Sequence, residues 1–465
     1  MTATPEPQPK FVEKRSIDYI PPSERHGRPI SLLFVWFAAN SSITALVTGA
    51  LMTILGNSAL WSIPAILLGN ILGGYITALH SAQGPQLGVP QMIQSRAQFG
   101  FYGAILPLVL ALFIYVGFYA TGLVLGGQAL GLLFHVSPQI GAILFAVFCA
   151  VSAIVGYRWI HRFSHLPAFL SAIVFVWLIV VMVTGDMGET IAASNGFAMA
   201  PFVLGVSLSA SWQLTFGPYI ADYSRYLPET TSQNATVGWT FLGSVLGASL
   251  AMTVGAFAAF LGGDAFSGSE VGYITDLAGK LGVIVLLAVI LGKLAGNTLS
   301  AYGGFMSITT IVSAFTKQDR LKSYTRTLFI LGVTAAALAI ALAASENFLT
   351  VFQNFLLFLL YFMTPWSAVN LVDFYLVRNK KYDIKGLFDP NGIYGKVNWI
   401  AYVAYLAGVI VQIPFMNSAI YVGPIAYLLN GAEIAWILGV VVSAVLYYLM
   451  TGNLRRRVRA AAAAA

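Results

Sequence analysis

The chain has 465 residues, of which 58% are hydrophobic and only 9% are charged, and its mean hydropathy is +0.80. This composition excludes a water-soluble domain and is typical of a chain folded in a bilayer. The single cysteine, Cys149, excludes an internal disulfide framework and a cysteine-based metal site. Residues 1–29 are polar and lack an apolar core, so we do not expect a cleavable signal peptide.

Long apolar stretches recur along the whole chain. Crossing the hydrocarbon core takes about 20 mainly apolar residues, and we predict twelve spans at 30–54, 57–81, 102–132, 137–156, 166–185, 198–221, 236–262, 281–305, 327–345, 349–372, 398–416 and 432–452. The sequence therefore predicts an all-α integral membrane protein with twelve transmembrane helices. These helices form a single transmembrane domain over 30–452, between tails at 1–29 and 453–465.

The formal net charge of +7 carries topological information. Lys and Arg are retained on the cytoplasmic side of a membrane. With the N-terminus inside, 22 of the 24 basic residues fall in tails, inner loops or inner helix ends, and the exceptions are Lys280 and Lys293. We therefore predict a multi-pass protein of the cytoplasmic (inner) membrane with both termini cytoplasmic. The basic residues do not indicate binding of nucleic acid, which needs them clustered on one soluble face.

Two of the predicted spans look like broken helices. The first contains a small polar cluster at residues 38–42, and the sixth is interrupted by Gly217 and Pro218. Irregular backbone persists in a bilayer only where it lines a cavity or is buried in protein. The two spans are five apart, as equivalent members of two inverted five-helix repeats would be, and such paired breaks point to a transporter's binding site. A proline kink and an unrelated polar helix contact form the alternative explanation.

Five stretches of the sequence resemble the purine and cytosine permease branch of the nucleobase cation symporter family. They are ERHGRPI, GPQLGVPQMIQSRAQFGFYGAILP, PYIADYSRYLP, NTLSAYGG and NLVDFYLVR. The resemblance implies a LeuT-type fold of the APC superfamily, with a five-plus-five inverted repeat, broken helices 1 and 6 and two C-terminal helices. Repeat one would cover about 30–185, repeat two about 198–372 and the last two helices about 398–452. It also implies import of cytosine, a purine or a related heterocycle by symport with protons or sodium, through alternating access.

The same resemblance implies the substrate-binding residues. Relatives stack the heterocycle between an aromatic residue of the third helix, here Phe118, and a residue at the break of the sixth, here Trp212 or Gln213. The sequence leaves open which of Trp212 and Gln213 faces the ligand. The remaining substrate residues implied are Thr215, Phe216, Asn297, Ala39 and Asn40. Some relatives use an amide further along the eighth helix, at a position that is Ala301 here.

These residue types also suit a planar heterocycle on chemical grounds. A base offers two π faces and an edge of mixed donors and acceptors, and stacking on an aromatic ring is worth about 1–3 kcal/mol. Each residue alone has a simpler explanation, because Phe118 could face lipid or the core and a membrane asparagine often bridges helices. Their coincidence with the two breaks favours a binding site.

The chain departs from the family at Lys293 and at the positions that would bind a coupling ion. Sodium sites of this fold use hydroxyls of the eighth helix, and the matching positions here are Ala295 and Gly296. A charge such as that of Lys293 costs about 2.5–3.5 kcal/mol at membrane depth on insertion scales. No acidic residue is predicted at that depth, and desolvation without a counter-charge favours the neutral amine.

We therefore hypothesise that protonated Lys293 takes the place of sodium against carbonyls of the first-helix break and couples uptake to protons. Lys293 shares a helical face with Asn297, four residues on. The residues assigned to cation coupling are Lys293, Ala38, Asn40, Asn297 and Thr298. A structural lysine that reaches toward the interface is the alternative.

Other classes of protein find less support. A membrane enzyme would show a convergent set of catalytic residues. A transporter driven directly by ATP would show a Walker-type loop, and a channel would show a repeated filter segment. We identify none of these features in the sequence. We therefore expect no catalytic residue, no metal site and no cofactor, and partners limited to the substrate and the lipid bilayer, with the monomer as working unit. Transport of hydantoin, allantoin or an amino acid by the same fold stays open, and the sequence does not separate one nucleobase from another.

Overall fold

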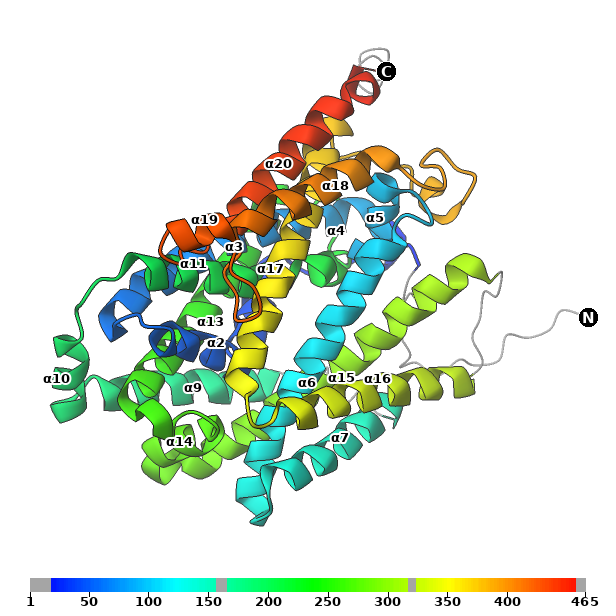
Figure 1. The fold of residues 1–465 in the computed structure, drawn as a ribbon. Coiled ribbons are helices and arrows are strands. Elements are labelled where there is room, and N and C mark those ends of the chain that lie inside the picture. Colours follow the sequence, from blue (N-terminus) through cyan, green and yellow to red (C-terminus); the bar gives the residue numbers. More distant parts are fainter. Residues whose placement is uncertain (1–17, 156–164, 317–322, 457–465) are drawn as a thin grey trace, which may run out of the picture.

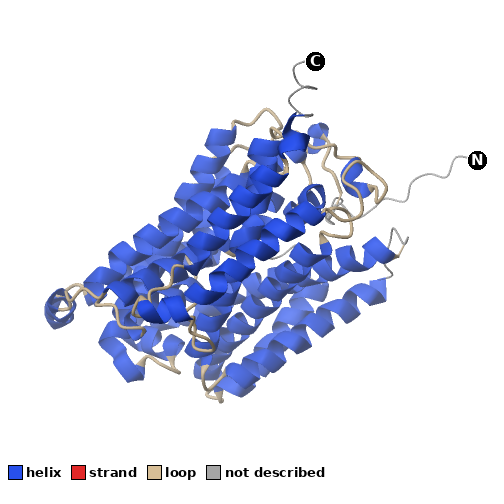
Figure 2. Ribbon diagram, turned by 45° about the horizontal axis from the view of Figure 1, so that its top comes forward, coloured by secondary structure: helices blue, strands red, loops and turns tan. Residues whose placement is uncertain are grey.

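The computed structural model describes residues 18–155, 165–316 and 323–456. Within these ranges helices are the only regular elements, apart from an isolated bridge between Asn417 and Val422 (Figures 1 and 2). Most of the two predicted tails, 1–29 and 453–465, lies outside the described residues. The all-α prediction is confirmed for the part of the chain that the structure describes.

A helix or a pair of helices lies at each predicted span. In the first half these are α1 (Ser31–Asn40) with α2 (Ile43–Ile54), α3 (Ala59–Ser81), α6 (Ile105–Phe134), α7 (Pro138–Val155), α9 (His165–Met182) and α11 (Met199–Leu214) with α12 (Ile220–Ser224). In the second half they are α13 (Gln233–Gly262), α15 (Gly282–Phe315), α16 (Ser323–Ala344), α17 (Phe348–Val372), α18 (Trp399–Gln412) and α20 (Ala435–Met450). Within the described ranges, 6 helices are long and apolar enough to cross a membrane, or up to 8 when each bent pair counts as one span.

The two predicted breaks coincide with interruptions of the helices. The axes of α1 and α2 differ by 57°, and the Ser42 hydroxyl caps α2 by accepting a hydrogen bond from the Ala45 N–H at 3.4 Å. In the sixth span, α11 ends at Leu214, and a 3-10 turn over Gly217–Tyr219 precedes α12. Pro218 is the second residue of this turn, where its missing N–H costs no helical hydrogen bond.

Small residues bring α1, α3, α11 and α13 into close contact. A Cβ atom on Gly247 of α13 would lie 2.5 Å from the Phe37 carbonyl oxygen of α1, and one on Gly73 of α3 would lie 2.5 Å from the Ala210 carbonyl oxygen of α11. Glycine at such crossings lets membrane helices approach closely. As a result, short polar side chains can bridge these four helices.

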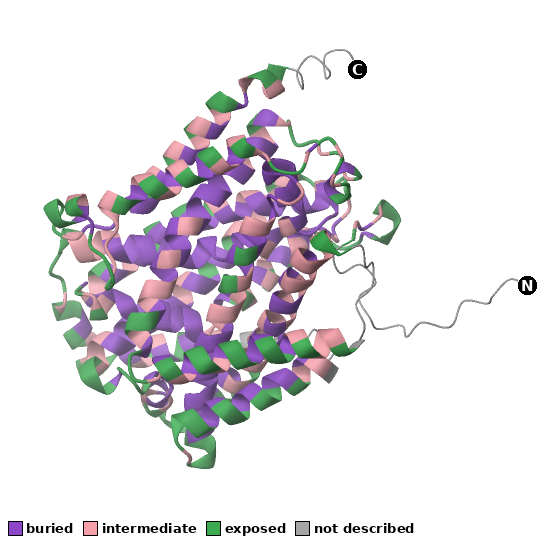
Figure 3. Cartoon of the chain, turned by 45° about the vertical axis from the view of Figure 1, so that its right-hand side comes forward, coloured by how far each residue is buried: buried purple, intermediate pink, exposed green. Residues whose placement is uncertain are grey.

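The remaining helices surround this group. In Figure 1, α7, α15 and α16 lie beside α6, while α18 and α20 run side by side next to α17. Figure 3 shows buried residues through the middle of the molecule and exposed residues on the outer helices. The exposed side chains include large apolar ones such as Phe169, Val147 and Ile410. An apolar outer surface of this extent suits contact with lipid.

Two short helices, α4 (Gln83–Leu87) and α5 (Gln91–Phe99), connect α3 to α6. Their buried amides bind one another and α17: the Gln83 amide donates to Asn370 Oδ1 at 2.7 Å, and the Asn370 amide donates to Gln98 Oε1 at 3.2 Å. Arg96 lies over the Phe101 ring, 4.2 Å from its centroid, and burial lowers the pKa of Arg96 to about 10. Arg96 therefore remains charged at neutral pH.

Asp373, at the end of α17, is the centre of a second buried network at the same end of the molecule. Its carboxylate accepts hydrogen bonds from Arg378 Nε at 3.2 Å, from the Tyr382 hydroxyl at 2.7 Å and from the Tyr447 hydroxyl at 2.9 Å. Tyr447 belongs to α20, so the carboxylate connects α17, α20 and the segment after α17. Removing one partner of a buried ion pair leaves the other charge uncompensated.

We expect Asp373→Ala to destabilise the protein by about 3 kcal/mol, because Arg378, whose side chain is only 13% exposed, and the hydroxyls of Tyr382 and Tyr447 then lose their carboxylate partner. The measurement is the thermal unfolding midpoint of the detergent-purified protein. Asp389→Ala is the control, because Asp389 is an exposed aspartate of the same segment after α17. An unchanged midpoint for Asp373→Ala would show that the network contributes nothing to stability.

Candidate functional site

Phe118 of α6 and Trp212 of α11 meet in the interior. Their ring centroids are 5.6 Å apart and the rings are perpendicular. Trp212 is 3% exposed, and Phe118 also contacts Phe355 of α17, with centroids 5.2 Å apart. Because the two rings are in edge-to-face contact, a heterocycle can stack between them only after they separate. This conformation therefore holds the aromatic pair closed.

Trp212 is held by Asn40, the last residue of α1. The indole N–H donates to Asn40 Oδ1 at 2.7 Å, and the Asn40 amide donates to the Trp36 carbonyl at 2.8 Å and to Ser244 Oγ at 3.0 Å. Asn40 is fully buried. The first-helix break is thus connected directly to the aromatic pair.

Gln213 points away from the aromatic pair, toward α3 and α13. Its amide donates to Asn70 Oδ1 at 2.8 Å and to the Ser244 carbonyl at 3.3 Å, and its Oε1 accepts from the Ser244 hydroxyl at 2.5 Å. Trp212 and Gln213 therefore lie on different sides of α11, and in this conformation Trp212 is the one that contacts Phe118.

Four other predicted residues lie close to the two breaks. The Thr215 hydroxyl donates to the Trp212 carbonyl at 2.6 Å, and the Phe216 ring packs edge-on against Trp212, with centroids 5.6 Å apart. In the last turn of α1, Ala38 is half-buried and Ala39 is exposed. The breaks therefore bring Thr215 and Phe216 next to the aromatic pair, whereas no side-chain contact joins the two alanines to it.

Asn297 of α15 is buried against α6. A Cβ atom on Gly122 would lie 1.9 Å from Asn297 Oδ1, so only glycine leaves room for this side chain. The Cys149 thiol of α7 interacts with the Asn297 side chain, but a thiol is only a weak acceptor. Asn297 Nδ2 has no hydrogen-bond partner among the described residues. An unpaired buried donor costs about 1–3 kcal/mol, which a ligand acceptor would recover. The neighbouring Thr298 hydroxyl, in contrast, donates to the Leu294 carbonyl at 2.7 Å.

Lys293 lies one turn from Asn297 on the same face of α15. Its ammonium group donates a hydrogen bond to the hydroxyl of Thr44 on α2. Thr44 is 1% exposed, Lys293 is half-buried, and no acidic side chain pairs with Lys293 within the described ranges. Sequence reasoning missed Thr44, although it lies four residues after Asn40. The hydrogen-bond partner of the lysine is thus a hydroxyl beyond the break, where we expected carbonyls of the break itself.

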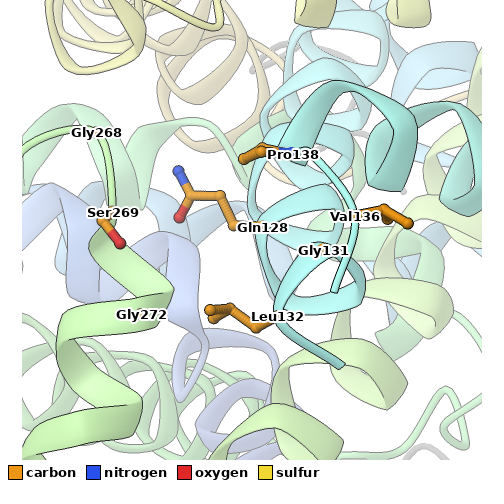
Figure 4. Close-up of a pocket in the computed structure, with 8 residues that line it drawn as sticks. All are labelled: Gln128, Gly131, Leu132, Val136, Pro138, Gly268, Ser269 and Gly272. Carbon is orange, nitrogen blue, oxygen red and sulfur yellow. The ribbon is translucent and has the colours of Figure 1, made fainter. Parts of the chain in front are cut away.

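Two cavities lined by described residues lie away from the aromatic pair. One of about 130 Å³ is lined by Gln128, Gly131, Leu132, Val136, Pro138, Gly268, Ser269 and Gly272 (Figure 4). A second cavity of about 100 Å³ shares Gln128. Both lie where the C-terminal part of α6 meets the segment before α14 (Glu270–Leu277), and none of the predicted site residues lines either one. Gln128, which lines both cavities, donates a hydrogen bond to Glu270 Oε2 at 2.6 Å.

Small-molecule transporters often place their site where two broken helices meet, and here both breaks reach the aromatic pair. The fold and the site define the class as membrane transport protein. Residues 19–439 match the model of a family described as permease for cytosine/purines, uracil, thiamine, allantoin, and the chain belongs to this family. Its function is therefore transport and not catalysis.

Individual relatives agree with this assignment. The chain is 40% identical to the putative purine-cytosine permease YxlA of Bacillus subtilis, over 96% of this chain and 97% of that protein. It is 27% identical to the purine-cytosine permease fcyB of Emericella nidulans, over 94% of this chain and 87% of that protein. Among solved structures, the inward-facing conformation of Mhp1 matches with a TM-score of 0.76 at 17% identity, over 98% of this chain and 96% of that chain. The last likeness confirms the LeuT-type fold.

Proposed function

We propose that the protein imports a nucleobase, cytosine or a purine, across the cytoplasmic membrane by cation symport with alternating access. The observation that carries this proposal is the contact of Phe118 with Trp212 beside both broken helices. A pair of aromatic rings that can separate offers two faces to a planar heterocycle. The names of the two purine-cytosine permeases similar to this chain support the same substrate class.

In this proposal each site residue has a distinct role. Phe118 and Trp212 stack against the heterocycle, and the free amide of Asn297 donates to an acceptor on its edge. Thr215 and Phe216 shape the site beside the sixth-helix break. The first-helix break, with Ala39 and Asn40, closes the opposite side, and Gln213 supports the site from behind.

The membrane arrangement is part of the same proposal. Twelve helices cross the bilayer, the first ten form two inverted five-helix repeats, and both termini are cytoplasmic. The partition of basic residues toward one side of the predicted membrane supports this orientation. We propose the monomer as the working unit.

We further propose that Lys293 is the coupling group, so that a proton takes the place of a sodium ion. In the protonated state the ammonium group binds Thr44 and joins α15 to α2. A neutral amine binds the hydroxyl more weakly, because charge-assisted hydrogen bonds are roughly twice as strong as neutral ones. Proton loss would therefore loosen the α2–α15 contact. Ala38, Asn40, Asn297 and Thr298 are the neighbouring cation-site residues of this proposal, and sodium coupling through their oxygens is the alternative.

Equilibrium binding tests the substrate class directly. We expect radiolabelled cytosine or a purine to bind the purified protein saturably, with one nucleobase displacing another and an amino acid displacing neither. Displacement by hydantoin or allantoin alone would move the assignment to that alternative substrate. Absence of binding by every nucleobase would overturn the proposal.

Asn297→Ala is expected to weaken nucleobase binding about 10-fold, because it removes one hydrogen bond to the edge of the base. The Kd from the same binding assay is the measurement. Thr310→Val is a suitable control, because Thr310 is a buried residue of α15 whose hydroxyl donates only to its own helix, at Met306 O. Equal Kd values for Asn297→Ala and the wild type would remove Asn297 from the binding site.

A further inference from the structure

We infer that Ser244 of α13 is a positioning residue, which sets the orientation of the Trp212 indole through Asn40. The inference rests on the proposed function, in which Trp212 stacks against the substrate. Ser244 stands in the middle of a hydrogen-bonded chain, here called the relay, whose members come from four helices. They are Trp212, Asn40, Ser244, Gln213 and Asn70.

The direction of the relay is fixed at each step. The indole N–H can only donate, so Asn40 must turn its Oδ1 toward Trp212 and its amide N–H groups toward Trp36 and Ser244. Ser244 Oγ accepts from Asn40 and donates its own hydrogen to Gln213 Oε1. A single hydroxyl thus serves both amides, and an apolar side chain at this position would leave one N–H of Asn40 and Oε1 of Gln213 without this partner.

The far end of the relay is anchored as well. Gln213 Nε2 donates to Asn70 Oδ1 on α3, and the Asn70 amide donates to Ser249 Oγ on α13 at 3.3 Å. Asn40, Gln213 and Asn70 are fully buried. Buried polar networks with every member satisfied are rigid and specify one arrangement of side chains.

This bonding changes the roles of two amides. Both N–H groups of Asn40 and both of Gln213 are used inside the protein. Neither amide has a donor left for a substrate, in contrast to Asn297. We therefore assign Asn40 and Gln213 to holding Trp212, and recognition of the base edge to Asn297.

The backbone around Ser244 suits this role. A Cβ atom on Gly243 would lie 2.3 Å from the Leu33 carbonyl oxygen, and one on Gly247 would lie 2.5 Å from that of Phe37. The backbones of α1 and α13 are therefore in contact on both sides of Ser244. At this separation a serine hydroxyl spans the gap to Asn40.

The test is a double-mutant cycle with Ser244→Ala and Trp212→Phe, read out by uptake kinetics. We expect Ser244→Ala to raise KM about five-fold with little change in kcat, because it removes one hydrogen bond from an otherwise intact site. In the Trp212→Phe background, which lacks the indole N–H, Ser244→Ala should cause little further increase, because coupled residues are non-additive. Thr240→Val is the matched control: Thr240 is buried one turn away on α13, and its hydroxyl has no partner among the described residues.

A fluorescence measurement separates this inference from the proposed function. The chain has 9 tryptophans. Subtracting the emission spectrum of a Trp212→Phe protein from that of the same protein with Trp212 isolates the emission of Trp212, and no substrate is needed. Ser244→Ala should shift this difference spectrum, and Thr240→Val should not.

If Ser244→Ala impairs folding, Ser244→Cys, with a weaker donor of similar size, should give an intermediate shift. An unchanged spectrum, or equal effects of Ser244→Ala on KM in both backgrounds, would overturn the inference. If wild type takes up no nucleobase but the spectrum shifts, the proposed function fails and the positioning role stands.

Discussion

Replacing Lys293 with glutamine is expected to abolish proton-driven accumulation while substrate binding persists. Glutamine can still bind the Thr44 hydroxyl, but it can neither carry a charge nor release a proton. One charge moving through 100 mV supplies about 2.3 kcal/mol, enough for about 50-fold accumulation. The Lys293→Gln protein should instead bring the substrate only to equal concentrations on both sides. The measurement is accumulation in proteoliposomes under an imposed proton gradient.

Lys280→Gln provides the control for the lysine prediction. Lys280 is the other basic residue away from the predicted cytoplasmic side, and it is exposed in the 3-10 turn that precedes α15. Thr44→Val should weaken coupling in the same direction as Lys293→Gln, because it removes the hydrogen-bond partner of the ammonium group. Proton-driven accumulation at the wild-type level in Lys293→Gln would refute the coupling role.

Trp212→Ala is expected to weaken nucleobase binding by about 1–3 kcal/mol, or about 5- to 150-fold in Kd, through the loss of one stacking face. Trp212→Phe keeps a ring and should lose less, because only the hydrogen bond to Asn40 disappears. The measurement is the Kd of the purified variants for the tightest-binding nucleobase. The thermal unfolding midpoint of each variant shows whether the fold is retained.

Trp61 provides the comparison for Trp212. Its indole packs against Phe197, with centroids 4.7 Å apart, near the start of α3 and away from the aromatic pair. Trp61→Ala should therefore leave the Kd unchanged. Wild-type affinity in a folded Trp212→Ala protein would place the substrate elsewhere in the molecule.

Much of the fold could be predicted from the sequence because hydrophobicity and backbone chemistry are local. Apolar runs of spanning length predicted where the helices lie, and Pro218 indicated the break in the sixth span. The polar cluster at 38–42 indicated the other break, which the structure places between Asn40 and Ile43. These features need no knowledge of neighbouring helices.

The contacts of the site could not be predicted in the same way. Adjacent residues of a helix point about 100° apart. An alignment that is uncertain by one position beside a break therefore does not decide which of Trp212 and Gln213 faces the ligand. The structure separates them by their partners, Phe118 for one and Asn70 for the other. Likewise, nothing in the local sequence connects Lys293 to Thr44, 249 positions away.

The closed aromatic pair also has a consequence for the transport cycle. Phe118 and Trp212 touch, and the Gln83–Asn370 and Asp373 networks connect the helix ends at one side of the molecule. In the proposed site, the Phe118 and Trp212 rings would have to separate before a substrate could stack between them. The helix of Phe118, α6, packs mainly against α7, α15 and α16, whereas the helix of Trp212, α11, packs mainly against α3. Movement of one of these sets of helices against the other would open the pair while the relay around Trp212 stays intact.

The most direct test of the account is uptake of radiolabelled nucleobases by wild-type protein in proteoliposomes, with proton and sodium gradients imposed separately. We predict accumulation of cytosine or a purine that follows the proton gradient and does not respond to sodium. Accumulation driven by sodium alone would contradict the role of Lys293 and keep the nucleobase assignment. Absence of nucleobase uptake under either gradient would contradict the central claim.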